Sequence, residues 1–155
     1  MIVVSDASPL IALARIDRLE LLREMFGTLL LPDSVWHEIT NAGMERAGAA
    51  FIVRADWIER RSVSNSSLVA RLRRDLGAGE SEAIALAQES HADVLLIDER
   101  LARVAAQRLG LRVTGLVGVL IEARQRGLLT DAAIVANDLE QKAGFWLSPG
   151  LRRLN

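Results

Sequence analysis

The chain has 155 residues, of which half are hydrophobic and 4% are aromatic, and its formal net charge is −1. This length predicts one domain, spanning residues 1–155, with an aliphatic core rich in helix. The absence of cysteine excludes disulfides and thiolate metal sites. No apolar run approaches the ~20 residues that a membrane span needs. The net charge of −1 gives no overall electrostatic attraction to nucleic acid.

The N-terminal segment lacks the features of a secretory signal. Residues 1–19 have no basic leader region, and they include Asp6 within their apolar part. The absence of cysteine is typical of proteins in a reducing compartment. Both observations favour a cytoplasmic protein.

Short apolar runs alternate with helical patterns along the first half of the chain. Uninterrupted aliphatic and β-branched runs are typical of parallel strands covered on both faces. Ser8-Pro9 favours a helix start, since serine is a good N-cap and proline suits the first helical position. The predicted elements are, in order, a strand (2–5), a helix from Ser8, a helix from 17 to 27, a strand (28–31), a helix (35–41), a helix within 44–53, where the pattern across 43–57 is weakest, and a strand (57–63).

The same alternation continues in the second half. The predicted elements are a helix (68–76), a helix from residue 80 to the turn at 91–93, a strand (94–97), a helix ending at 110, a strand (111–114), helices at 115–126 and 131–139, and a short strand and turn at 144–149. Alternating strands and helices predict a single α/β sheet with helices on both faces.

The most informative stretch is residues 76–99, LGAGESEAIALAQESHADVLLIDE. Gly77 and Gly79 form a turn-prone segment, and Glu80 then begins a helix whose middle is apolar on every side and therefore buried. The strand that follows ends at Asp98. Since sites in open parallel sheets gather outside the carboxyl ends of the strands, we expect Glu80 and Asp98 to face a common rim.

Four acids from four separate elements form a candidate site. They are Asp6 after the first strand, Glu38 in the third helix, Glu80 and Asp98. Carboxylates gathered in a water-poor place raise one another's pKa unless a divalent cation offsets their charge. Oxygen ligands in a chain without cysteine favour Mg²⁺ or Mn²⁺. A carboxylate-held metal pair activates water and stabilises the leaving oxygen in phosphodiester hydrolysis.

Each of these acids also has an ordinary structural explanation. Asp6 could cap the helix that follows it, and Asp98 could do the same for the helix after its strand. Glu80 and Glu82 are favourable partners for a helix dipole, and Glu38 could simply be solvated at an exposed helix edge. The occurrence of two strand-end acids together with two helix acids favours the site.

Four motifs, in this order, resemble the PIN-domain ribonucleases: VVSDASPLIALARI, LLLPDSVWHEI, LGAGESEAIALA and LLIDERLARVAAQRLGLRVTGLVGVL. The resemblance covers residues 3–121 and is greatest to the branch with a Gly-x-Gly-Glu motif, which is related to VapC-type toxins. It implies a PIN-like three-layer α/β/α sandwich with a central, mainly parallel sheet. It also implies a Mg²⁺- or Mn²⁺-dependent endoribonuclease that hydrolyses single-stranded RNA.

The resemblance further implies roles for particular residues. The four catalytic acids of the family match Asp6, Glu38, Glu80 and Asp98, and metal binding is expected of the first, third and fourth of these. Ser8 matches a small polar residue that assists the first acid. Many relatives are toxins held by a small antitoxin, and many are dimers, so an antitoxin partner and a homodimer are expected.

Spacing decides between two neighbouring glutamates as the third acid. Glu80 and Glu82 are about 200° apart on a helical wheel, so we do not expect both to face one site. In the similar proteins the third acid is followed by small apolar residues at the fifth and seventh positions, which Glu80 satisfies with Ala85 and Ala87. We therefore assign Glu80, and leave Glu82 a helix-dipole contact. Many family members have aspartate here, so the glutamate lengthens the ligand by one methylene.

Arginines supply candidate contacts to RNA. Arg100 and Arg103 lie three apart on one side of the helix after Asp98, where they would contact phosphates, although a solvated face is the alternative. The alternative function is a non-catalytic PIN-like module that binds RNA or a protein partner. Four intact acids argue against it, because a pure binder has no use for concentrated negative charge facing phosphates.

Overall fold

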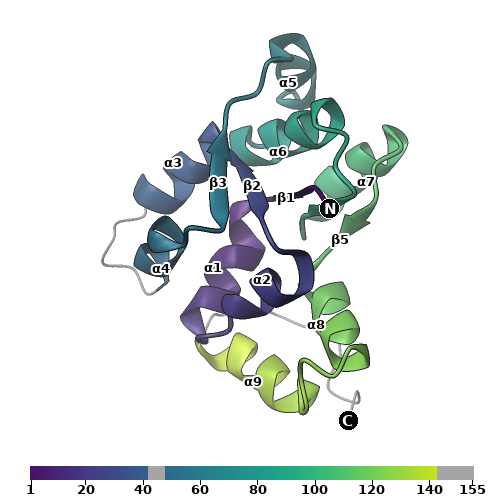
Figure 1. The fold of residues 1–155 in the computed structure, drawn as a ribbon. Helices are drawn as coiled ribbons and strands as arrows, with labels where there is room; N and C mark the ends of the chain where they lie inside the picture. Colours follow the sequence, from purple (N-terminus) through teal and green to yellow (C-terminus); the bar gives the residue numbers. More distant parts are fainter. Residues whose placement is uncertain (42–47, 143–155) are drawn as a thin grey trace.

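The computed structural model describes residues 1–41 and 48–142, which form a five-stranded sheet between two layers of helices (Figure 1). The strands are β1 (Val3–Ser5), β2 (Leu29–Pro32), β3 (Ile58–Arg61), β4 (Val94–Leu96) and β5 (Val113–Thr114). The helices are α1 (Ala7–Arg15), α2 (Glu20–Phe26), α3 (Asp33–Asn41), α4 (Ala49–Arg54), α5 (Ser66–Leu72), α6 (Ala78–Glu89), α7 (Arg100–Arg108), α8 (Leu116–Gln125) and α9 (Ala132–Lys142). The predicted strand and turn at 144–149, and residues 44–47 of the helix predicted within 44–53, lie outside the described residues; the rest of that helix corresponds to α4. Among the described helices, none combines the length and apolar character that a membrane span requires.

The sheet is parallel throughout, with its strands in the order β3-β2-β1-β4-β5. From β1 the chain moves outward to β2 and β3, and it then returns to the opposite side of β1 to form β4. The direction of winding therefore reverses between β1 and β4. Open α/β sheets form a crevice at such a switch point, outside the carboxyl ends of the strands. The predicted α/β/α architecture is confirmed.

Alternate side chains of the strands divide the interior into two cores. Val3 faces the core shared with α1, α2, α3, α4, α8 and α9, whereas Val4 faces the core shared with α6 and α7. In β2, Leu29 and Leu31 face the first core and Leu30 faces the second. Burial on both faces explains why these strands are uninterrupted apolar runs in the sequence.

The first helix begins two residues earlier than predicted, so Ser8 is not its N-cap. Asp6 occupies that position with extended backbone angles (φ −79°, ψ 169°), and α1 begins at Ala7. The strand pairing extends to Asp6, whose N–H donates to the Leu96 carbonyl at 2.9 Å, and the helix follows directly with no loop between them. Ser8 is left exposed in the first helical turn.

The helix of the most informative stretch also begins earlier than predicted. Gly77 is its N-cap with an extended backbone (φ −68°, ψ 167°), and α6 starts at Ala78. Gly79 therefore lies inside the first helical turn rather than in a turn before it. Neither glycine has a positive φ, so nothing in the backbone delays the helix. Gly79 matters because it has no side chain, which leaves space beside the acids of the candidate site.

Candidate functional site

Two of the four predicted acids lie at the switch point of the sheet. Asp6 directly follows β1, Asp98 lies two residues beyond β4, and these two strands are neighbours. Both residues therefore stand at the carboxyl edge of the central strand pair, β1 and β4. This is the place where the topology leaves room for a site.

Asp6 is a buried carboxylate whose side chain does not cap the helix after it. The residue is 7% exposed, and its side chain makes no capping hydrogen bond, which removes the capping explanation. Burial raises the pKa of Asp6 to about 7, although a hydrogen bond from the Ala7 backbone opposes the rise. The negative charges of Glu38, Glu80 and Asp98 raise it further. The charges of the other three predicted acids thus act on Asp6.

Gly79 marks the space that two of these carboxylates share. A Cβ at this position would lie 3.4 Å from Oε2 of Glu38, 3.5 Å from Oδ1 of Asp6 and 3.4 Å from Cγ2 of Val35. The carboxylates of Glu38 and Asp6 therefore approach the same small volume, which the missing side chain leaves open. Glu38 is itself exposed and reaches this volume from the solvent side.

Glu80 is half-buried in the first turn of α6, next to this volume. Partial burial raises the pKa of Glu80, and the charge of Glu99 contributes next, ahead of that of Glu38. Glu99 is an exposed acid, not among the predicted site residues, whose charge acts on Glu80. It also caps α7, accepting a hydrogen bond from the Ala102 N–H at 2.8 Å. The one feature of the sequence that could have pointed to Glu99 is its position directly after Asp98, an acid at the end of a strand.

Asp98 is half-buried and bonded to α8. Its Oδ1 accepts the Leu116 N–H at 2.9 Å, and Glu99 caps the helix that Asp98 could have capped, so that explanation is wrong. A side chain at Gly115 would collide with the same oxygen. Oδ2 is buried and has no hydrogen-bond partner among the described residues. Burial raises the pKa of Asp98, while the Leu116 bond and the Arg103 charge lower it.

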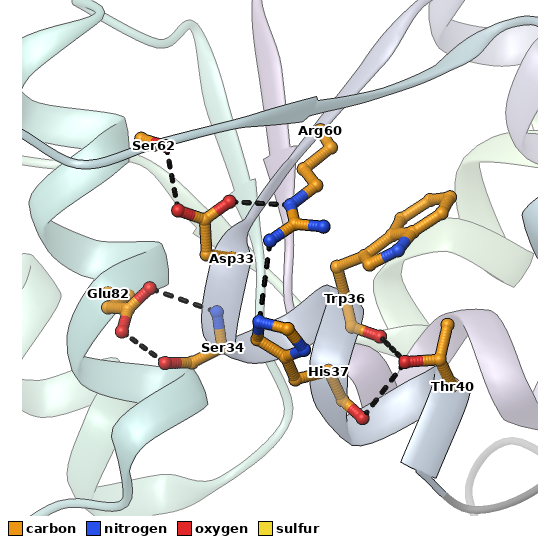
Figure 2. A network of polar contacts seen from close by, with 8 residues as sticks. All are labelled: Asp33, Ser34, Trp36, His37, Thr40, Arg60, Ser62 and Glu82. Carbon is orange, nitrogen blue, oxygen red and sulfur yellow. Dashed lines mark hydrogen bonds and ion pairs between the residues drawn. The ribbon is translucent and has the colours of Figure 1, made fainter.

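Glu82 serves a different neighbour from Glu80. Its carboxylate accepts hydrogen bonds from the Ser34 N–H, at 3.0 Å, and from the Ser34 hydroxyl (Figure 2). The expectation that Glu82 contacts only its own helix dipole is therefore wrong. The first N–H groups of α3 lack partners within their own helix, and the packing of α6 brings Glu82 to one of them. The assignment of Glu80 as the third acid stays a prediction.

The other predicted residues differ in their surroundings. Ser8 and Arg100 are exposed. Arg103 is half-buried, and its Nη1 lies 3.1 Å from the position that a Cβ of Gly115 would take, close to Asp98. Arg103 is thus turned toward an acid of the site. The roles predicted for these three side chains stay predictions.

Within residues 1–41 and 48–142, no group of three or more carboxylate or imidazole side chains is arranged so that it could hold a metal ion. The acids share an electrostatic environment, but they do not form a closed ligand cage.

A parallel five-stranded sheet between helical layers, with acids at its switch point, places the protein in the PIN-like class of α/β/α domains. The chain belongs to the PIN-domain family, because the family model DUF3368, described as a PIN domain, matches residues 2–154. The fold is similar to that of a PilT N-terminus domain protein from the hyperthermophilic archaeon Sulfolobus solfataricus P2, with a TM-score of 0.55 and 18% identity over 79% of this chain and 93% of that chain. No curated protein matches the chain. The predicted PIN-domain identity is confirmed, and the VapC-type branch stays a prediction.

Proposed function

We propose that the protein is a metal-dependent endoribonuclease that hydrolyses phosphodiester bonds of single-stranded RNA. The observation that carries the proposal is the buried Oδ2 of Asp98, which has no hydrogen-bond partner in the described part of the chain. A buried carboxylate oxygen without a partner is costly unless a cation compensates it. PIN domains are generally nucleases, and they usually use divalent metal ions.

The donor set fits Mg²⁺ or Mn²⁺. We assign Asp6, Glu80 and Asp98 as the residues that would hold the ion, since all their donors are carboxylate oxygens. Burial raises the pKa of each, which is typical of carboxylates whose charge lacks a nearby cation. When bound, such an ion stabilises negative charge on phosphate oxygens and lowers the pKa of water.

The remaining predicted residues would not hold the ion, and each would act through its own side chain. Glu38 is exposed beside the open volume at Gly79, where its carboxylate would hold an attacking water and accept its proton. Arg103 lies close to Asp98 and favours its ionised form. Arg100, exposed at the start of α7, would contact a phosphate of the RNA. Ser8 would assist from the first turn of α1, as the family resemblance implies.

We also propose that this ribonuclease is a cytoplasmic toxin, a homodimer inhibited by a small antitoxin. The support is the resemblance of its motifs to those of VapC-type proteins, many of which have such a partner. A short gene that overlaps the start of this one and whose product copurifies with the protein would support the pairing. A neighbouring gene product that neither binds the protein nor inhibits it would contradict it.

The function is tested with end-labelled single-stranded RNA, incubated with Mn²⁺ or Mg²⁺, with and without EDTA. We expect cleavage that needs the metal and is lost in Asp98→Asn purified in the same way. Equal cleavage by wild type and Asp98→Asn would assign the activity to a contaminant. Binding of RNA by the wild type without cleavage of any substrate would establish the non-catalytic module instead.

A methyl group at position 79 should weaken metal binding without weakening the fold. In a helical turn alanine is favoured over glycine by about 1 kcal/mol, and the new contacts at 3.4–3.5 Å are ordinary. The methyl group would nevertheless fill the volume between Glu38 and Asp6. We expect Gly79→Ala to lose most of the increase in melting temperature that millimolar Mn²⁺ gives the wild type.

The matched control for this variant is Gly77→Ala. A Cβ at Gly77 has no neighbour within 4 Å, so this methyl group points into open space. Gly77→Ala should keep the wild-type response to Mn²⁺. An unchanged Mn²⁺ response in Gly79→Ala would show that metal does not bind in this volume.

A further inference from the structure

We infer that the two hydrogen bonds between Glu82 of α6 and Ser34 of α3, here called the clasp, position Glu38 against the other acids. Glu82 and Ser34 are thus positioning residues for the metal site. This inference rests on the proposed metal-dependent function. It assigns a role to two residues that touch none of the reacting groups.

The clasp joins two helices that are distant in the sequence. Both donors of Ser34, its backbone N–H and its hydroxyl, are directed to the carboxylate of Glu82, 48 residues away (Figure 2). The N–H belongs to the first turn of α3 and has no acceptor within that helix. A carboxylate at a helix N-terminus is favoured by the dipole as well as by the hydrogen bonds. Glu82 therefore serves as an N-cap supplied by another helix.

The same contact surface includes an acid of the site. Ser34 and Glu38 are four residues apart and lie on one face of α3, with Val35 beside them. Gly79 and Glu82 are three residues apart and lie on one face of α6. The position that a Cβ of Gly79 would take lies beside Val35 and Glu38, and Glu82 binds Ser34, so the two faces pack against each other. A shift or rotation of α3 on this surface would move the Glu38 carboxylate away from the volume at Gly79.

The start of α3 is also held from its other side. Asp33 accepts hydrogen bonds from Arg60 Nε at 2.6 Å and from Ser62 Oγ at 2.7 Å, and Arg60 also contacts His37 Nε2 at 3.3 Å (Figure 2). Because a guanidinium only donates, His37 Nε2 accepts in this contact. These bonds tie α3 to β3 and to the residue after it, and the clasp supplies hydrogen bonds from the first turn of α3 to α6. Loss of the clasp should thus loosen the contact between α3 and α6 without unfolding the first turn of α3.

The test measures Mn²⁺ binding by isothermal titration, well below the melting temperature and in the absence of RNA. Ser34→Ala removes one donor, Glu82→Ala removes the acceptor, and Ser34→Thr keeps a hydroxyl. We expect Glu82→Ala to weaken Mn²⁺ binding by about tenfold, the effect typical of removing a residue that orients a metal ligand. Ser34→Ala should weaken it less, and Ser34→Thr should restore it.

A stability-matched control separates positioning from general destabilisation. Leu72→Ala in α5 removes packing against the second core, which contains α6, but leaves the clasp intact. We expect Leu72→Ala to lower the melting temperature while keeping the wild-type affinity for Mn²⁺. Equal losses of affinity in Leu72→Ala and Ser34→Ala would overturn the positioning role.

Two further outcomes separate this inference from the proposed function. If Glu82→Ala and Ser34→Ala bind Mn²⁺ as the wild type does, the clasp does not position the site, although the function stands. If the wild type binds no Mn²⁺, or Asp98→Asn binds it equally well, the proposed site itself fails. If Glu82→Ala does not fold, Ser34→Ala and Ser34→Thr still decide the question.

Discussion

Asp6→Asn should abolish RNA cleavage while making the metal-free protein more stable. Removing one member of a cooperative catalytic group typically lowers the rate by about 10³-fold or more. At pH 8 the ionised Asp6 is buried among like charges, whereas an asparagine is neutral and still accepts the Ala7 N–H. We expect the melting temperature in EDTA to rise by about 5 °C or more. Rates and melting curves of the same preparations provide the measurement.

The control for this variant is Asp75→Asn, which changes the net charge equally at an exposed position. It should change neither the cleavage rate nor the melting temperature appreciably. An active Asp6→Asn enzyme would remove Asp6 from the catalytic group. An inactive variant that is also less stable in EDTA would show that the carboxylate is not under electrostatic strain.

The metal-free protein should lose stability as the pH rises from the acidic to the neutral range. Because the pKa of Asp6 is about 7 in the fold against a usual value of 3.8, the folded protein binds more protons than the unfolded chain between these values. The free energy of unfolding therefore falls with increasing pH over this window. For Asp6 alone we expect a loss of about 2 kcal/mol between pH 5.5 and pH 8. Asp98 and Glu80, whose pKa values are also raised by burial, contribute in the same direction.

Denaturant unfolding in EDTA at several pH values measures this dependence. Asp6→Asn should flatten it, because an amide does not titrate. Saturating Mn²⁺ should weaken or reverse it in the wild type, since metal binding requires deprotonated ligands. A metal-free protein that is more stable at pH 8 than at pH 5.5 would contradict the raised pKa of Asp6.

The elements that could be predicted from the sequence are those whose signal lies within one segment. β1 and β4 are uninterrupted apolar runs because both faces of each strand are buried, and this pattern placed Asp6 and Asp98 at strand ends. Helix starts were predicted less accurately. Ser8-Pro9 has good local capping chemistry, but Asp6, which is still paired with β4, takes the N-cap position, and α1 begins at Ala7.

The site shows the same division between local and distant information. Asp6 and Asp98 could be named because each follows its own strand. Glu82 could not be assigned a partner, since Ser34 is 48 residues away and nothing in either segment specifies the other. Glu99 could not be connected with Glu80 from the sequence, because its charge acts on Glu80 only through the packing of α7 against α6.

By itself, the sequence determined the composition of the core, the alternation of strands and helices and the positions of two strand-end acids, because hydrophobic periodicity and chain breaks are local properties. The tertiary structure alone decided the strand order, the switch point between β1 and β4 and the approach of Asp6 and Glu38 to the space beside Gly79. It also decided that Asp98 bonds to Leu116 of α8 rather than capping α7, the helix that follows it. These features depend on which segments, distant in the sequence, pack against one another, and only the packing of the whole domain determines that.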